Sequence, residues 1–148
     1  MLRGSYTARM DDKGRLKIPA DFKRYLEETY KSADFYVTSL SGEDVWIYPL
    51  KEWEEKEKRL ALVPSTVTAL QRYLDRVSYF GQMQHMDSQN RILIHPLLRG
   101  TAELMGDVMV MGKMDFLDVW EVERFRTARL LAQPFTDSDF DALSNYGI

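Results

Sequence analysis

One loop-and-strand segment occurs twice in this chain, and that repetition is the feature that most limits how the chain can fold. Residues 10–23 read MDDKGRLKIPADFK, and residues 86–99 read MDSQNRILIHPLLR. When the two segments are aligned residue by residue, the following pairs match: Met10 with Met86, Asp11 with Asp87, Arg15 with Arg91, Ile18 with Ile94, and Lys23 with Arg99. The same loop-and-strand unit is therefore used twice, with different loop chemistry in each copy.

A second motif repeats further along the chain. Asp44-Val45-Trp46 matches Asp118-Val119-Trp120, at nearly the same offset as the first pair of segments. The patterns predict a strand–loop–strand–helix–strand–strand unit over 2–53 and again over 79–125. Because units of this length bury too little surface to be stable alone, we expect the two halves to interleave their strands into one shared core with a pseudo-twofold axis.

Local signals define the ends of the predicted elements. Asp11 to Gly14 reads as a turn, and Asn90 occupies the place of Gly14 in the second copy, where a positive φ is expected. Ser65 is the predicted N-cap of a second linker helix, and the chain from Pro134 onward is predicted to be frayed and acidic. These signals divide the chain as follows: a first repeat at 1–53, a helical linker at 54–78, a second repeat at 79–125, and a helix end and acidic tail at 126–148.

Composition places the chain among ordinary globular proteins. It has 148 residues, a formal net charge of −3 and no cysteine, so disulfides and thiolate metal sites are excluded. No apolar run approaches the roughly 20 residues of a membrane span, and we expect a cytoplasmic protein. The charge is uneven: residues 1–24 carry seven basic and three acidic side chains, whereas residues 99–148 carry five basic and nine acidic ones. A polyanion would therefore meet the N-terminal end first.

Catalytic and metal-binding readings find little support. Asp11 and Asp12 are adjacent, point apart in a strand–turn and have basic neighbours, and His85 and His95 need not converge. No glycine-rich phosphate loop or serine nucleophile elbow is present. We expect no enzyme activity, no metal, no cofactor and no small-molecule substrate.

At the level of whole segments, the chain resembles a known family. MLRG, DDKGRLKIPADFK, IYPLKEWE, DSQNRILIHPLLR and DVWEVERF occur in this order and resemble the bacterial MraZ transcriptional regulators over about residues 1–130. The chain departs from the usual pattern at Asn90, where glycine is typical, and at His95, where proline is typical.

The resemblance implies both a fold and a function. The fold is α+β, with two tandem AbrB-like swapped-hairpin repeats that form an intertwined, pseudo-twofold, β-barrel-like core with flanking helices. The function is that of a nucleoid-associated, DNA-binding transcription factor of the division and cell-wall gene cluster. Such a protein is a homo-oligomeric ring that presents its loops to direct repeats in its own upstream region. A ring used as a protein-interaction scaffold and a non-specific nucleic-acid-binding protein are the alternatives.

The loops supply the candidate DNA contacts. Arg15 could pair with Asp11 across the turn, or its planar guanidinium could reach a guanine edge or a phosphate. The expected DNA-binding set consists of Arg15, Lys13, Arg3, Arg9, Lys17 and Arg91, with the first copy dominant because it holds more positive charge. The residues expected to organise the loops are Asp11, Gly14, Asp87 and Asn90. For Arg91, a structural tie to Asp87 is the favoured role.

Overall fold

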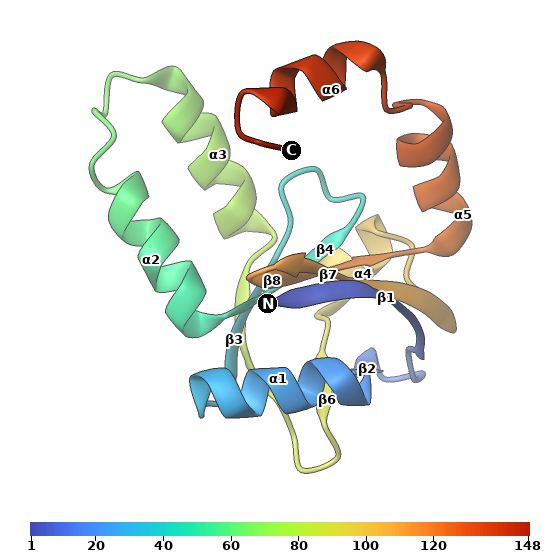
Figure 1. Cartoon of the computed structure of the whole chain (residues 1–148). Helices are drawn as coiled ribbons and strands as arrows, with labels where there is room; N and C mark the ends of the chain where they lie inside the picture. The colour runs from blue at the N-terminus through green and yellow to red at the C-terminus, as the bar shows by residue number, and fades with distance from the viewer.

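The two halves of the chain contribute equivalent strands to one α+β molecule. The computed structural model describes residues 1–148 (Figure 1). The first half supplies β1 (Leu2–Arg9), β2 (Arg15–Lys17), α1 (Ala20–Tyr30), β3 (Asp34–Thr38) and β4 (Val45–Pro49). The second half supplies β5 (Gln82–His85), β6 (Arg91–Leu93), α4 (Pro96–Thr101), β7 (Asp107–Met114) and β8 (Phe116–Trp120). Between them lie α2 (Leu50–Leu60) and α3 (Thr68–Tyr79), and the chain ends with α5 (Val122–Phe125), the π-helical turn η1 (Arg126–Leu131) and α6 (Asp137–Ser144).

The order of strands in the main sheet shows the predicted interleaving. The six-stranded sheet runs β1-β7-β8-β4-β3-β5. In the two halves, β1 corresponds to β5, β3 to β7 and β4 to β8. Replacing each strand by its counterpart gives the same sheet order read backwards, so the sheet has a pseudo-twofold axis between β4 and β8. The first strand of each half pairs with a strand of the other half: β1 with β7, and β5 with β3. The expected barrel-like closure is not confirmed, because β1 and β5 form the two edges of this sheet.

The repeated segments meet in a separate two-stranded ribbon. β2 pairs antiparallel with β6, with Leu16 opposite Ile92, and both of these side chains are fully buried. The backbone N–H of Ile18 donates to the carbonyl of Asn90, and that of Ile94 donates to the carbonyl of Gly14, each at 2.9 Å. These reciprocal bonds continue the pseudo-twofold relation beyond the main sheet and hold the two loops side by side.

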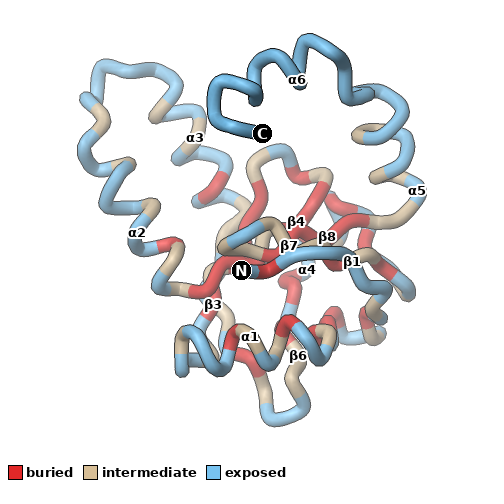
Figure 2. The backbone as a smooth tube through the Cα atoms, viewed as in Figure 1, coloured by how far each residue is buried: buried red, intermediate tan, exposed pale blue.

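The linker helices form a hairpin that extends from the body. Trp53 anchors α2 and Val77 anchors α3, whereas most of the rest of the hairpin is not buried (Figure 2). The predicted N-cap at Ser65 is wrong, because α3 begins at Thr68. Val67 takes the N-cap position, and its backbone N–H donates to the carbonyl of Pro64 at 3.0 Å. The turn that starts at Pro64 therefore occupies the residues that a helix capped by Ser65 would need.

The C-terminal residues also differ from the prediction. The helix end expected at the start of residues 126–148 is the π-helical turn η1, which directly follows α5. The frayed tail expected after Pro134 is wrong, because α6 is a capped helix in which the Thr136 side chain and Asp139 form a reciprocal capping box. Every residue from Leu130 to Ile148 is nevertheless at least partly exposed, so local bonds alone order this helix.

A pair of buried aspartates lies where β4 and β8 meet. Asp44 precedes β4, Asp118 lies in β8, and each carboxylate accepts a hydrogen bond from the indole N–H of the tryptophan two residues further on. Lys113 donates to Asp118 Oδ2 at 2.6 Å, whereas Asp118 Oδ1 is buried and has no N–H or O–H donor. Burial and the nearby Asp118 carboxyl raise the pKa of Asp44 to about 7. A proton on Asp44 would make one member of this carboxyl pair a hydrogen-bond donor toward the other.

Candidate nucleic-acid interface

The first loop is held together by its own aspartate. Asp11 Oδ1 accepts hydrogen bonds from the backbone N–H of Lys13 at 3.0 Å and of Arg15 at 2.8 Å. Asp11 Oδ2 accepts a third bond from Nε of Arg15 at 2.7 Å. Gly14 lies between them with a φ of 82°, a conformation that an L side chain rarely adopts. One carboxylate therefore closes the turn and also orients the arginine side chain.

The second loop repeats these bonds. Asp87 Oδ1 accepts from the backbone N–H of Gln89 and of Arg91, and Asp87 Oδ2 accepts from Nε of Arg91, each at 2.9 Å. Asn90 has a φ of 62°, as expected for the residue in the place of Gly14. Arg15 and Arg91 therefore make the same hydrogen bonds within their own loops. The structural role favoured for Arg91 stays a prediction.

Both aspartates are held in the charged state. The backbone N–H of Arg15 is the largest cause that lowers the pKa of Asp11, and its guanidinium and the Lys13 N–H lower it further. The Arg91 N–H has the same dominant effect on the pKa of Asp87. Each carboxylate is fully engaged by donors of its own loop. The neighbouring guanidinium keeps its Nη groups for other partners, apart from one contact of 3.8 Å between Arg91 Nη1 and Asp11 Oδ2.

The pairing of β2 with β6 merges the two loops into one surface. A pocket of about 320 Å³ is lined by Arg9, Asp11, Arg15, Lys17, Gln89 and Arg91. It holds four basic side chains against one carboxylate, and it draws on both repeats. Along the ribbon, Lys17 lies opposite Arg91, and Arg15 lies opposite the partly exposed Leu93.

Gln89 is the pocket residue that the predicted site omitted. It corresponds to Lys13 when the two copies of the loop are aligned. The sequence could have indicated Gln89 through this correspondence, because a predicted DNA contact at Lys13 implies an equivalent contact position in the second loop.

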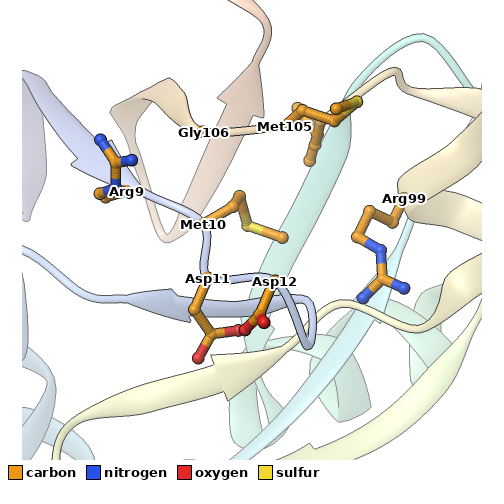
Figure 3. A pocket seen from close by; sticks show the side chains of 8 residues that line it. Arg9, Met10, Asp11, Asp12, Arg99, Met105 and Gly106 are labelled. Carbon is orange, nitrogen blue, oxygen red and sulfur yellow. The ribbon is translucent and has the colours of Figure 1, made fainter.

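A second pocket adjoins the first on the other side of Asp11. Its volume is about 400 Å³, and its lining consists of Arg9, Met10, Asp11, Asp12, Arg99, Leu104, Met105 and Gly106. Figure 3 shows Arg9 and Arg99 on opposite sides of this pocket, with Met10 between them. The guanidinium of Arg99 also packs against Gly14, where an added Cβ would overlap it. Arg99, the counterpart of Lys23, thus supports the first loop from the second half of the chain.

The remaining candidates are spread more widely. Lys13 is exposed in the loop. Arg9 makes an exposed ion pair of 3.4 Å with Asp107. Arg3 does not lie beside the loop: it pairs with Lys113 at the far end of β1, roughly 20 Å from Arg9 at the usual rise of a strand.

The histidines and carboxylates form no metal cluster. His85 Nδ1 lies 2.8 Å from Asp34, whereas His95 is buried just before α4. No group of three or more histidine, cysteine, aspartate or glutamate side chains comes together anywhere in the structure. None of the helices has the length and apolar character that a membrane crossing requires.

These observations define a class of protein: a duplicated α+β chain whose halves exchange strands and present two equivalent aspartate–arginine loops on one ribbon. Comparison with known proteins agrees with this class. The family model described as "MraZ protein, putative antitoxin-like" matches residues 1–77 and 81–143, and the chain belongs to the MraZ family. The match extends into α6, beyond the end near residue 130 that the sequence motifs suggested.

Three curated relatives share one name. Proteins named "Transcriptional regulator MraZ" from Acidobacterium capsulatum and Koribacter versatilis are 45% and 44% identical over 148 residues, covering all of both chains. The protein of that name from Limosilactobacillus fermentum is 36% identical over 145 residues, covering 97% of this chain and 94% of its own length. The name describes a regulator rather than an enzyme, in agreement with the expectation that the chain has no catalytic activity.

Proposed function

We propose that this protein is a transcriptional regulator that binds double-stranded DNA through the β2–β6 ribbon and its two loops. The observation that carries the proposal is the shared basic surface, in which Arg15, Lys17 and Arg91 lie together although Arg91 comes from the other half of the chain. The names of the relatives support the regulatory role.

The two-stranded shape of the β2–β6 ribbon suits the major groove of DNA. The major groove of B-form DNA admits a two-stranded ribbon, and arginine is the side chain that most often reads guanine there. The ribbon buries Leu16 and Ile92 and turns Arg15, Lys17 and Arg91 away from the core. Because the aspartates engage only Nε of the arginines at hydrogen-bond distance, the guanidinium groups are oriented before DNA arrives. Less side-chain entropy is then lost on binding.

A homo-oligomeric ring would make such contacts additive. One subunit offers a few basic side chains, which give weak binding alone. A ring that places several ribbons on consecutive direct repeats raises the effective concentration of each later contact. Within this proposal, the target is the protein's own upstream region in the division and cell-wall gene cluster, and the protein works in the cytoplasm on the nucleoid.

Fluorescence anisotropy tests the proposal. Labelled duplex from the upstream region and a scrambled duplex are titrated with wild type, Arg15→Ala, Arg91→Ala and a matched control, Lys58→Ala on α2. We expect each loop variant to lose about 10- to 100-fold in affinity for the native duplex, as for loss of one arginine–base contact, and the control to bind like wild type. A subunit that neutralises about three phosphates gives a log–log salt slope of about −2.7.

The same titrations separate the alternatives. Equal, steeply salt-dependent binding to both duplexes would show a non-specific nucleic-acid-binding protein. No binding to either duplex at low salt would leave a protein-interaction scaffold as the function. Normal binding by both loop variants would show that the ribbon is not the interface.

A further inference from the structure

The tips of the two loops carry different side chains on the same backbone. Lys13 and Gln89 occupy equivalent positions in the aligned segments. The Lys13 N–H donates to Asp11 Oδ1 at 3.0 Å. The Gln89 N–H donates to Asp87 Oδ1 at 2.9 Å in the same way. Because these bonds hold the two tips alike, any functional difference between them lies in the side chains, which are a cation in one loop and a neutral amide in the other.

The Gln89 side chain has no structural task in the protein. It is exposed, and its amide makes no hydrogen bond with another group of the chain. The backbone N–H of Gln89, not its side chain, helps to close the loop. Figure 1 shows this loop, between β5 and β6, projecting beyond α1 at the edge of the molecule. The amide is therefore free to bind a group outside the chain, and its removal leaves the bonds of the loop intact.

Gln89 also lies among the basic side chains of the proposed interface. It lines the pocket of about 320 Å³ that holds the four cations, whereas its counterpart Lys13 does not. The one carboxylate in that lining, Asp11, is already occupied by donors of its own loop. Gln89 is therefore the lining side chain that brings both an unused hydrogen-bond donor and an unused acceptor to this surface.

The chemistry of an amide fits a base edge better than it fits a phosphate. A phosphate offers acceptors and negative charge, which suit lysine or arginine, and the amide carbonyl would stay unpaired there. Among the four bases, adenine alone carries an acceptor, N7, beside a donor, the N6 amino group, on its major-groove edge, and glutamine pairs with both at once. Guanine carries two acceptors, which suit arginine. An amide that gives up its water without gaining both partners weakens binding.

We propose that Gln89 is a specificity-determining residue of this interface, and that it reads an adenine in the major groove next to the bases contacted by Arg15 and Arg91. The inference rests on the proposed DNA-binding function and names a base that the site selects. The competing role for Gln89 is a contact with a phosphate. Such a contact adds affinity for every sequence, whereas base reading adds affinity only where the adenine is present.

Base analogues test this contact at the level of single atoms. In the labelled duplex from the upstream region, each adenine is replaced in turn by 7-deazaadenine, which keeps base pairing and the N6 amino group but lacks the N7 acceptor. Anisotropy titrations then compare wild type with Gln89→Ala. We expect one adenine at which the analogue weakens wild-type binding about fivefold or more, as for loss of one hydrogen bond, and leaves Gln89→Ala unaffected. Equal losses in both proteins at every adenine, or no loss in wild type at any adenine, would overturn the inference.

Two further variants separate base reading from charge. Gln89→Lys copies the first loop at this position, so it should bind every duplex more tightly, with a log–log salt slope steeper by about 0.9, and should lose the response to the analogue. Gln71→Ala makes the same chemical change as Gln89→Ala at an exposed position of α3, away from the ribbon, and should keep the wild-type response. A wild-type response retained by Gln89→Lys would assign the adenine preference to another side chain and refute the proposal.

The proposed function is tested separately from the adenine contact. The titrations of Arg15→Ala and Arg91→Ala report on the ribbon whichever base Gln89 contacts. Weakened binding by those two variants, together with an unaltered analogue response in Gln89→Ala, would refute the adenine contact and leave the ribbon as the interface. A wild-type protein that binds neither the native nor the scrambled duplex would refute the DNA-binding function and this inference together.

Discussion

Asp44→Asn should stabilise the protein at neutral and alkaline pH, because burial beside Asp118 favours the protonated form of Asp44 and ionisation of this side chain opposes folding. Its pKa lies near 7 in the folded chain, against an ordinary value of 3.8. At about 1.4 kcal/mol for each pH unit between those values, deprotonation of the folded state opposes folding by up to about 4 kcal/mol. The asparagine amide keeps the volume of the side chain and carries an N–H donor that does not titrate.

The sign of the pH dependence follows from which state holds the proton. Between about pH 4 and 7 the unfolded chain has released the Asp44 proton while the folded chain retains it. The free energy of unfolding of the wild type therefore falls as pH rises through this window and levels off above it. Asp44→Asn removes this titration, so its stability should change far less across the same window.

Urea unfolding followed by tryptophan fluorescence at pH 4.5, 6 and 8, at one protein concentration, measures the effect. The control is Asp12→Asn, the same change at an exposed loop residue, which should keep the slope of the wild type. If Asp44→Asn kept that slope too, the proton would not reside on Asp44, and the reasoning about the buried pair would be refuted.

Three further predictions concern the ribbon and its loops. Gly14→Ala places a Cβ at a positive φ, where the Arg99 guanidinium must move aside and the Ile94 carbonyl lies 3.0 Å away, and it should cost about 1–2 kcal/mol in urea unfolding. Asn90→Gly, which keeps that φ accessible, should cost little. Leu16→Ala removes a fully buried side chain and should cost about 2–5 kcal/mol in thermal unfolding, and Leu93→Ala on the outer face of the ribbon should cost far less. Because the folded pKa values of Asp11 and Asp87 are lowered, the loop bonds should persist above the unfolded pKa near 3.9 and disappear as pH falls through the folded values. An NMR pH titration of the Arg15 and Arg91 backbone amides would show the loss of these loop hydrogen bonds. Amide chemical shifts that stay constant as pH falls below the unfolded pKa would contradict the prediction.

The loops were the most predictable part of the candidate site. Asp11 and Arg15 are four residues apart around a turn, so short-range geometry nearly determines their contact, and Asn90 adopts the positive φ that its place in the repeat implied. The capping box of α6 was also visible in principle, since Thr136 and Asp139 have the required spacing. The acidic stretch after Pro134 nevertheless suggested a frayed tail.

The relation between the two arginines could not be predicted from composition. The first loop holds more charge, which suggested that it would dominate DNA contact and that Arg91 would mainly be tied to Asp87. The structure gives Arg15 and Arg91 the same bonds and places them around one pocket. Gln89 enters that pocket and Arg3 does not. Each of these outcomes depends on which strand pairs with which.

The sequence by itself determined the duplication, the turns, most of the helices and the chemistry of each loop, because these depend on residues within a few positions of one another. Only the tertiary structure decided that β1 pairs with β7, that β2 pairs with β6, and that Asp44 lies beside Asp118. An alternating strand pattern states which face is buried but does not name the partner strand. In a duplicated chain each strand has two similar partners to choose from. Which strands of one half pair with strands of the other half depends on how much apolar surface the whole core can bury. No short stretch of the chain carries that information.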